Sequence, residues 1–111
     1  MRFRAPLFSL AMILSLAAYA NISLADVYCS ETVTGVVMHS NGNVYFTSSG
    51  TCALSWCEIA FVSADANNKA YALLLIALTT GKPVAIDWPN ITGCTQQNVV
   101  YAVPGFITLP Q

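Results

Sequence analysis

The chain has 111 residues, 56% of them hydrophobic, and four Lys and Arg residues stand against five Asp and Glu residues. A chain of this length and composition is expected to form one domain. With so few basic residues, nucleic acids and anionic lipid surfaces are poor candidate partners, and a single histidine argues against nucleophilic catalysis by a triad.

Residues 1–25 have the pattern of a secretory signal peptide. A basic start (Met1-Arg-Phe-Arg4) precedes an apolar run over residues 7–20, and two small-x-small cleavage sites follow, the second ending at Ala25. We expect cleavage after Ala25, which leaves residues 26–111 as the mature chain. An uncleaved membrane anchor is the alternative, although the apolar run is short for a spanning helix. The charged residues of the mature chain are Lys69 and Lys82 against Asp26, Glu31, Glu58, Asp65 and Asp87, a net charge of −3.

All four cysteines lie in the mature part of the chain. An even number of cysteines in a small exported domain predicts two disulfides. A zinc site is the alternative, but the Cys52-x4-Cys57 spacing is loose and the lone His39 is distant. Of the three possible connectivities, we favour Cys52–Cys94 together with Cys29–Cys57.

The first half of the mature chain predicts three strands. Residues 32–39 are rich in β-branched side chains and predict the first strand. Residues 40–43 contain Asn-Gly, which predicts a tight hairpin turn, and residues 44–48 form the returning strand. After a loop over residues 49–55, residues 56–62 predict the third strand.

A helix is expected next. Residues 70–78 are nine consecutive apolar residues dominated by Ala and Leu, which favours a helix over residues 66–80. Asp65 or Asn67 is expected to cap its start, and Gly81 suits the left-handed position after its end.

Two further strands complete the predicted fold. Residues 82–88 form the fourth strand, residues 89–95 a loop and residues 98–103 the fifth strand, which residues 106–109 either extend or leave to pair separately. Three strands, a helix and two strands predict a five-stranded antiparallel OB-fold-like barrel with one helix between strands three and four. A hairpin-rich α+β sandwich is the alternative.

The predicted helix is apolar on two opposite sides. One stripe consists of Ala66, Ala70, Leu73 and Ala77, and the opposite stripe consists of Tyr71, Leu75 and Leu78. A small domain has one core and can cover only one of these stripes, so the second is expected to need another partner. We therefore predict a homo-oligomer whose interface includes Tyr71, Leu75 and Leu78.

Several motifs resemble the B subunits of bacterial AB5 toxins of the subtilase-cytotoxin and pertussis-like type. They are Thr34-Gly-Val-Val37 in the first strand, and the helix that runs into Thr80-Gly-Lys-Pro-Val-Ala-Ile86. The pairs Gly50-Thr-Cys52 and Gly93-Cys94 also resemble the cysteine placement of small exported proteins of Gram-negative bacteria with the same plan.

The resemblance implies an OB-fold protomer that assembles into a ring, often a pentamer, with the helices lining a central pore. It also implies glycan binding on the outer surface, a periplasmic or secreted location in a Gram-negative bacterium, and a possible separate toxin A chain. Thr34 stands where a serine of the toxin subunits contacts sialic acid. No arginine remains in the mature chain, so a sialic-acid carboxylate would have to be met by backbone N–H groups, hydroxyls or lysine.

Sugar recognition uses an aromatic face together with fixed amide and hydroxyl groups. The candidate ligand-binding residues of these types are Thr34, Asn41, Asn43, Tyr45, Thr47 and Trp88. Ordinary turn chemistry and cross-strand pairing are the alternative for the hairpin residues, and Trp88 could instead cover the mouth of the barrel. We expect Glu58 and Asp87 to be solvated strand residues.

These observations predict a secreted or periplasmic oligomeric binding module, with glycan recognition implied by the resemblance. An exported structural or interaction protein without a sugar site is the alternative, and a small hydrolase is a third reading that the residue inventory disfavours. We expect no catalytic residue, no metal ligand, no cofactor, no nucleic-acid partner and no membrane span after cleavage.

Overall fold

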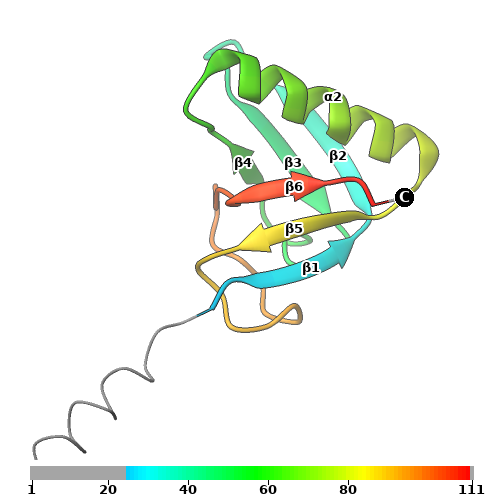
Figure 1. Ribbon diagram of the computed structural model, residues 1–111, viewed down its shortest axis with the longest axis vertical. Coiled ribbons are helices and arrows are strands. Elements are labelled where there is room, and N and C mark those ends of the chain that lie inside the picture. The colour runs from blue at the N-terminus through cyan, green and yellow to red at the C-terminus, as the bar shows by residue number, and fades with distance from the viewer. Residues whose placement is uncertain (1–24, 111) are drawn as a thin grey trace, which may run out of the picture.

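A computed structural model describes residues 25–110, so the expected signal peptide lies outside the described residues apart from Ala25. The elements in chain order (Figure 1) are β1 (Val27–Glu31), β2 (Val33–Met38), β3 (Val44–Ser48), β4 (Cys57–Ile59), α2 (Ala64–Thr80), β5 (Val84–Trp88) and β6 (Phe106–Thr108). They form two three-stranded antiparallel sheets, ordered β1-β5-β6 and β2-β3-β4. The chain is therefore a small α+β protein.

The β2-β3-β4 sheet is a hairpin extended by a short third strand. Alternate residues of β3, namely Val44, Phe46 and Ser48, are buried, and the residues between them face outward. This alternation is typical of a strand with one face on the core. The hairpin turn contains Gly42 at φ +89°, a conformation that favours glycine. Both predicted strands of the hairpin are confirmed to within one residue at each end, whereas β4 is shorter than predicted.

The β1-β5-β6 sheet has β5 at its centre. Val84, Ile86 and Trp88 of β5 are buried, and Ile86 lies opposite Cys29 of β1 and Ile107 of β6. The sequence prediction missed β1, because polar residues interrupt its apolar pattern. The last predicted segment pairs separately with β5, as β6.

The predicted strand over residues 98–103 is wrong, because this segment is irregular. Two backbone hydrogen bonds join this segment to β4 and to the residue before it, without forming a ladder. The Tyr101 N–H donates to the Trp56 carbonyl at 2.7 Å, and the Glu58 N–H donates to the Ala102 carbonyl at 2.9 Å. Tyr101 adopts a positive φ of 62°, which interrupts an extended strand. The expected five-stranded closed barrel is therefore not found in residues 25–110, which contain six shorter strands in two sheets.

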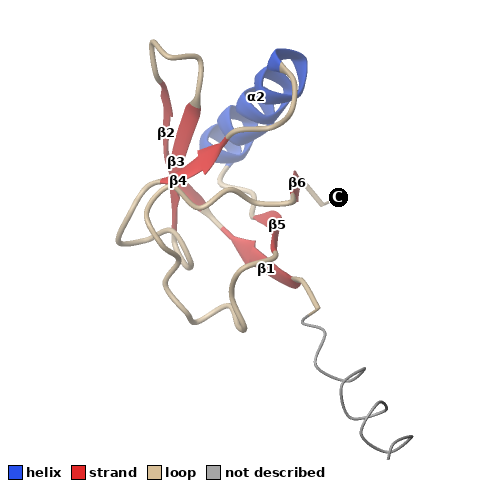
Figure 2. Cartoon of the chain, turned by 90° about the vertical axis from the view of Figure 1, so that its left-hand side faces the viewer, coloured by secondary structure: helices blue, strands red, loops and turns tan. Residues whose placement is uncertain are grey.

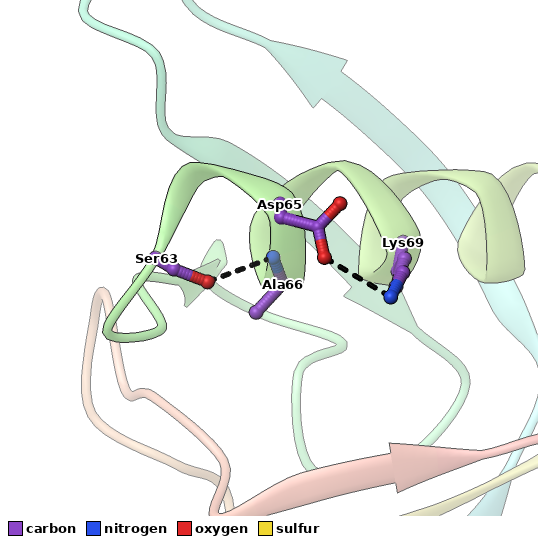
Figure 3. A network of polar contacts seen from close by, with 4 residues as sticks. All are labelled: Ser63, Asp65, Ala66 and Lys69. Atoms are coloured by element: carbon purple, nitrogen blue, oxygen red, sulfur yellow. Dashed lines mark hydrogen bonds and ion pairs between the residues drawn. The ribbon is translucent and has the colours of Figure 1, made fainter.

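The helix α2 begins and ends with recognisable caps. Ser63 has extended backbone angles and its Oγ accepts a hydrogen bond from the Ala66 N–H at 3.1 Å (Figure 3). The prediction of Asp65 or Asn67 as the cap is wrong, because Asp65 pairs instead with Lys69 at 3.0 Å on the helix surface. Gly81 ends the helix in the left-handed conformation at φ +72°, as predicted. No helix within residues 25–110 has the length and apolarity needed to cross a membrane.

The core lies between the helix and the two sheets. The helix runs across one end of the sheets and contacts β2 most extensively (Figures 1 and 2). It contributes Ala70, Leu74 and Ala77 to the core, against Phe46 and other buried strand residues. A fully buried Leu side chain such as Leu74 stabilises the fold by about 1.5–3 kcal/mol.

All four cysteines form disulfides, but the pairing that we favoured from the sequence is wrong. The pairs are Cys29–Cys94, with Cα atoms 5.5 Å apart, and Cys52–Cys57, with Cα atoms 5.8 Å apart. The first pair joins β1 to the loop after β5, and the second closes the tight loop that precedes β4. Our favoured pairing treated Cys52 as a long-range anchor, whereas the loop turns back and brings it against its neighbour in the sequence.

Glu31, at the end of β1, is buried and holds the two sheets together. Its carboxylate accepts hydrogen bonds from the Ser48 hydroxyl at 2.7 Å, from the Thr51 hydroxyl at 2.6 Å and from the Thr51 backbone N–H. The Trp88 indole N–H also points to it at 3.5 Å. A buried carboxylate needs such donors, and here strands of both sheets and one loop supply them.

Candidate ligand-binding site

A hollow of about 290 Å³ lies on the outer face of the β2-β3-β4 sheet. It is lined by Val37, His39, Tyr45, Trp56 and Tyr101. The ring centroids of Tyr45 and Tyr101 are 5.3 Å apart, and those of His39 and Tyr45 are 6.0 Å apart at nearly a right angle. Trp56 and Tyr101 are 39% and 55% exposed, so solvent reaches their rings. The hollow therefore presents accessible aromatic surface.

Strand pairing brings the first four lining residues together. Tyr45 of β3 faces outward because its neighbours Val44 and Phe46 are buried. Val37 of β2 lies directly opposite Tyr45, so its side chain is on the same face of the sheet. Trp56 immediately precedes β4, which pairs with β3 on its other side. His39 follows β2 at the start of the hairpin turn. A regular antiparallel hairpin is thus enough to build this side of the hollow.

Tyr101 reaches the hollow from the irregular segment near the end of the chain. Its backbone N–H donates to the Trp56 carbonyl, which fixes the two aromatic residues next to each other. A non-glycine residue at positive φ is uncommon and is held there by its surroundings. Backbone strain of this kind is frequent at functional sites, and here it turns Tyr101 toward Tyr45.

The hairpin turn fixes the polar side of the hollow. The Asn41 amide donates to the Tyr45 hydroxyl at 3.3 Å, and the Asn43 amide donates to Glu58 at 2.6 Å. His39 Nδ1 accepts a hydrogen bond from the Asn41 backbone N–H at 3.1 Å, so the other ring nitrogen faces away from the turn. These bonds hold amide, phenol and imidazole groups in fixed positions at the edge of the aromatic surface.

Thr34 and Thr47 lie on the same face of the sheet, next to Trp56. Their hydroxyls form a hydrogen bond at 2.8 Å. Gly35 of β2 has no side chain. A Cβ atom there would come within 2.8 Å of the Thr47 hydroxyl and 3.7 Å of the Trp56 ring. The glycine therefore leaves room for the hydroxyl pair and the indole to approach each other.

Of the six predicted ligand-binding residues, Tyr45 lines the hollow, Asn41 and Asn43 lie in the adjoining hairpin turn, and Thr34 and Thr47 lie on the strands of the same hairpin. Trp88 does not belong to the hollow, because its side chain is fully buried in the core and is not available as an exposed platform. The sequence prediction did not include Val37, His39, Trp56 and Tyr101. In a strand over residues 56–62, Trp56 and Glu58 lie on one face by alternation, which is a signal that could have identified Trp56. Nothing local to Tyr101 indicates its position.

The hollow lacks positive charge. None of the residues that line it is Lys or Arg, and the nearby Glu58 is half-buried and accepts the Asn43 amide. The expectation that Glu58 is solvated is thus only partly met, and for Asp87 it is wrong, because Asp87 is 3% exposed. Residues 25–110 contain no group of three or more His, Cys, Asp and Glu side chains suited to holding a metal ion.

The outer surface of α2 remains apolar. Leu75 and Leu78 of the predicted second stripe are 37% and 39% exposed, and Ile76, which was not part of that stripe, is 51% exposed. Tyr71 is the exception in that stripe, because it is half-buried and packs against the core cluster. Leu74, rather than a residue of the predicted inner stripe, is the most deeply buried large side chain of the helix.

A second hollow, also of about 290 Å³, lies between the first half of α2 and β6. Its lining is mostly apolar and includes Phe61, Leu73 and Phe106, with Lys69 as its one charged residue. It lacks the fixed amides and hydroxyls that surround the aromatic hollow, and it therefore suits an apolar protein segment better than a sugar.

Comparison with known proteins adds nothing to the geometry. No family model matches the chain, and no curated protein and no solved structure matches it.

Proposed function

We propose that this protein is an exported, oligomeric binding module whose aromatic hollow binds a neutral glycan. The observation that carries the proposal is the convergence of Tyr45, Trp56 and Tyr101, with His39, around one exposed hollow. A pyranose ring has an apolar face that packs on an aromatic ring and hydroxyl groups that need fixed polar partners. The hollow offers both kinds of surface side by side.

A neutral sugar fits the charge of the hollow better than an acidic one. A sialic-acid carboxylate requires a cation or several aligned donors. The lining supplies no Lys or Arg, and Glu58 stands nearby. The hydroxyls of Thr34 and Thr47, already paired with each other, would serve as donors and acceptors for sugar hydroxyls instead.

Export is supported by the disulfides. Two disulfides in a small domain are typical of oxidising compartments such as the periplasm or the extracellular space. They accord with the signal-peptide pattern of residues 1–25.

The proposal also includes an OB-fold-like barrel and assembly of several copies of the chain. The order of pairing, with β2 against β3, β3 against β4, β1 against β5 and β5 against β6, is the order of an OB-fold if β1 and β2 are two halves of one bent strand. The hydrogen bonds between residues 101–102 and residues 56–58 lie where that barrel would close. The exposed Leu75, Ile76 and Leu78 would form the interface between copies.

The second candidate is an exported interaction protein without a sugar site. The apolar hollow between α2 and β6 favours it, because its lining suits a protein segment. This candidate predicts that the aromatic hollow has no ligand.

A glycan array with the mature chain tests the proposal. We expect binding to one or more neutral glycans, and we expect Trp56→Ala to weaken it at least tenfold, because the indole supplies the largest apolar contact. Leu54→Ala is the matched control: Leu54 lies two residues away, is 83% exposed and does not line the hollow, so its removal should leave binding unchanged.

Two results would count against this function. Absence of binding to every glycan on the array would favour the interaction protein. Light scattering that shows the mature chain to be a monomer would remove the assembly part of the proposal and leave the sugar site to stand by itself.

A further inference from the structure

Asp87 is a buried acid, and one of its carboxyl oxygens accepts no hydrogen bond from the described residues. It lies on β5, in the centre of its sheet, and its side chain is 3% exposed. Among the residues that the structure describes, its Oδ1 atom is buried and has no hydrogen-bond partner. Burying an ionised carboxyl group without donors is unfavourable, so an acid in this position either keeps its proton or pairs with a cation.

Two aromatic rings cover Asp87 on the outer face of the β1-β5-β6 sheet. Tyr28 of β1 and Phe106 of β6 are its direct cross-strand neighbours, and their ring centroids lie 5.7 Å apart. Gly105 closes the remaining side, since a Cβ atom there would overlap the Asp87 Oδ2 atom. Between these neighbours, Asp87 is almost entirely removed from solvent.

Asp26 stands beside this acid. It precedes Tyr28 by two residues, so it lies on the same face of the sheet and diagonally across from Asp87. Burial, followed by a side-chain hydrogen bond to Asp26 and by the charge of Asp26, raises the pKa of Asp87. Two carboxyl groups can share such a bond only while one of them holds a proton, so the pair is short of one positive charge when both acids are ionised.

The basic side chains of the described residues do not supply that charge. Lys69 pairs with Asp65 at 3.0 Å on the helix. Lys82 lies five residues from Asp87 along the extended chain, about 16 Å away at roughly 3.3 Å per residue. His39 belongs to the hairpin of the other sheet, where it contacts Tyr45.

We propose that the partner of Asp87 is the α-ammonium group of Asp26, which forms when the signal peptide is removed after Ala25. Hydrolysis by a signal-peptidase-type protease consumes one water, leaves a carboxylate on Ala25 and an amine on Asp26, and the amine takes up a proton from solvent. Before cleavage the same nitrogen is an uncharged amide that cannot balance the two acids. This inference rests on the exported part of the proposed function.

Removal of the signal peptide would then stabilise the fold of the mature chain. The new ammonium group places one positive charge between two carboxylates, in a site that aromatic rings partly shield from water, where opposite charges attract more strongly than in bulk solvent. The precursor keeps the acid pair uncompensated and would be the less stable form. The cation–acid contact would also fix the first strand at its free end.

The chain offers a direct way to test this inference. Cys29 permits ligation of a synthetic Asp26-Val27-Tyr28 thioester to the remainder of the mature chain, so that the same protein can be made with a free or an acetylated amine. Acetylation removes the charge and leaves the side chains intact. The measurements are thermal unfolding and the NMR titration of the ¹⁵N-labelled Asp26 amine.

We expect acetylation to lower the melting temperature by about 4–8 °C, which corresponds to about 1 kcal/mol in a domain of this size. We expect the amine to titrate above its ordinary pKa of about 7.7–8.0. In the Asp87→Asn chain both effects should largely disappear, because the amide that replaces the acid carries no charge.

Equal melting temperatures for the free and acetylated chains, or an amine that titrates at its ordinary pKa, would overturn the inference. So would a first residue other than Asp26 in the protein recovered after export, as determined by N-terminal sequencing. None of these results bears on glycan binding by Trp56, so the inference and the sugar site can fail separately.

Discussion

Glu31 and Asp87 are two buried acids on adjacent strands of the same sheet, and they are stabilised in different ways. Glu31 accepts hydrogen bonds from Ser48 and Thr51 and faces the Trp88 indole N–H, so donors surround its carboxylate. Within residues 25–110, Asp87 has one oxygen without a donor, and a second acid stands beside it. The comparison teaches that burial alone does not define the role of an acid: Glu31 joins parts of the fold through its donors, whereas Asp87 faces a second acid.

Both acids also pack against a glycine. A Cβ atom on Gly50 would come within 2.6 Å of a Glu31 oxygen, and one on Gly105 would overlap an Asp87 oxygen. Both sites are therefore too crowded for a side chain, and they differ in how firmly the acid is held. This difference can be tested by substitution.

The largest effect is expected for Glu31→Gln. The substitution removes the charge from several hydrogen bonds and turns an amide N–H₂ group toward donors, so we expect the free energy of unfolding to fall by about 3 kcal/mol. Denaturant or thermal unfolding measures it. Glu58→Gln is the control, since Glu58 is half-buried and accepts one amide bond, from Asn43. Equal losses in the two variants would contradict the role of Glu31.

The glycine substitutions should have smaller effects. Gly50→Ala and Gly105→Ala each force a methyl group against a buried acid and are expected to destabilise the fold by about 1–3 kcal/mol. The loss should be greater at Gly50, because Glu31 is held by its donors and cannot move aside. Gly93→Ala is the control, since the added atom would meet open space. A greater loss at Gly105 would mean that Asp87 is the more rigid of the two acids.

The smallest effect is expected for Asp87→Asn in the chain with an acetylated amine. Since the pKa of Asp87 is raised in the folded state, its contribution to stability is complete below the pKa of the unfolded chain and is lost as the pH rises through the folded value. The variant has no such loss. We therefore expect equal melting temperatures near pH 3 and, at pH 7, an advantage of about 1–3 °C for the variant.

A pH-independent difference between these two chains would contradict that account. With a free amine at pH 7 the order should reverse, because the acid then has a charged partner and the amide does not. This reversal separates the cost of ionising the buried Asp87 from its attraction to the Asp26 amine, within one pair of variants.

The local elements of the fold could be predicted from the sequence because each depends on near neighbours. The run of Ala and Leu predicted the helix, and Gly81 ended it as expected. The Asn-Gly turn and the β-branched residues around it predicted the hairpin. The start of the helix was misassigned because three polar residues near it compete for the cap, and Ser63 has the required extended backbone.

The candidate site was only half predictable. Tyr45 and the asparagines of the turn follow from the hairpin, and the alternation around Trp56 pointed to the same face. Tyr101 depends on a left-handed backbone and on a bond to a distant carbonyl, neither of which leaves a periodic pattern. Trp88 was predicted to belong to the site because it ends a strand, yet its side chain is fully buried in the core.

The sequence by itself determined the hairpin, the helix, its exposed apolar stripe and the presence of four cysteines suited to disulfides, because spacing and side-chain type decide these features over a few residues. The tertiary structure decided which cysteines pair, which aromatic rings share a hollow and which acid is buried without a donor. Those outcomes depend on how distant segments meet, and the contacts that join them are made between residues that share no pattern along the chain.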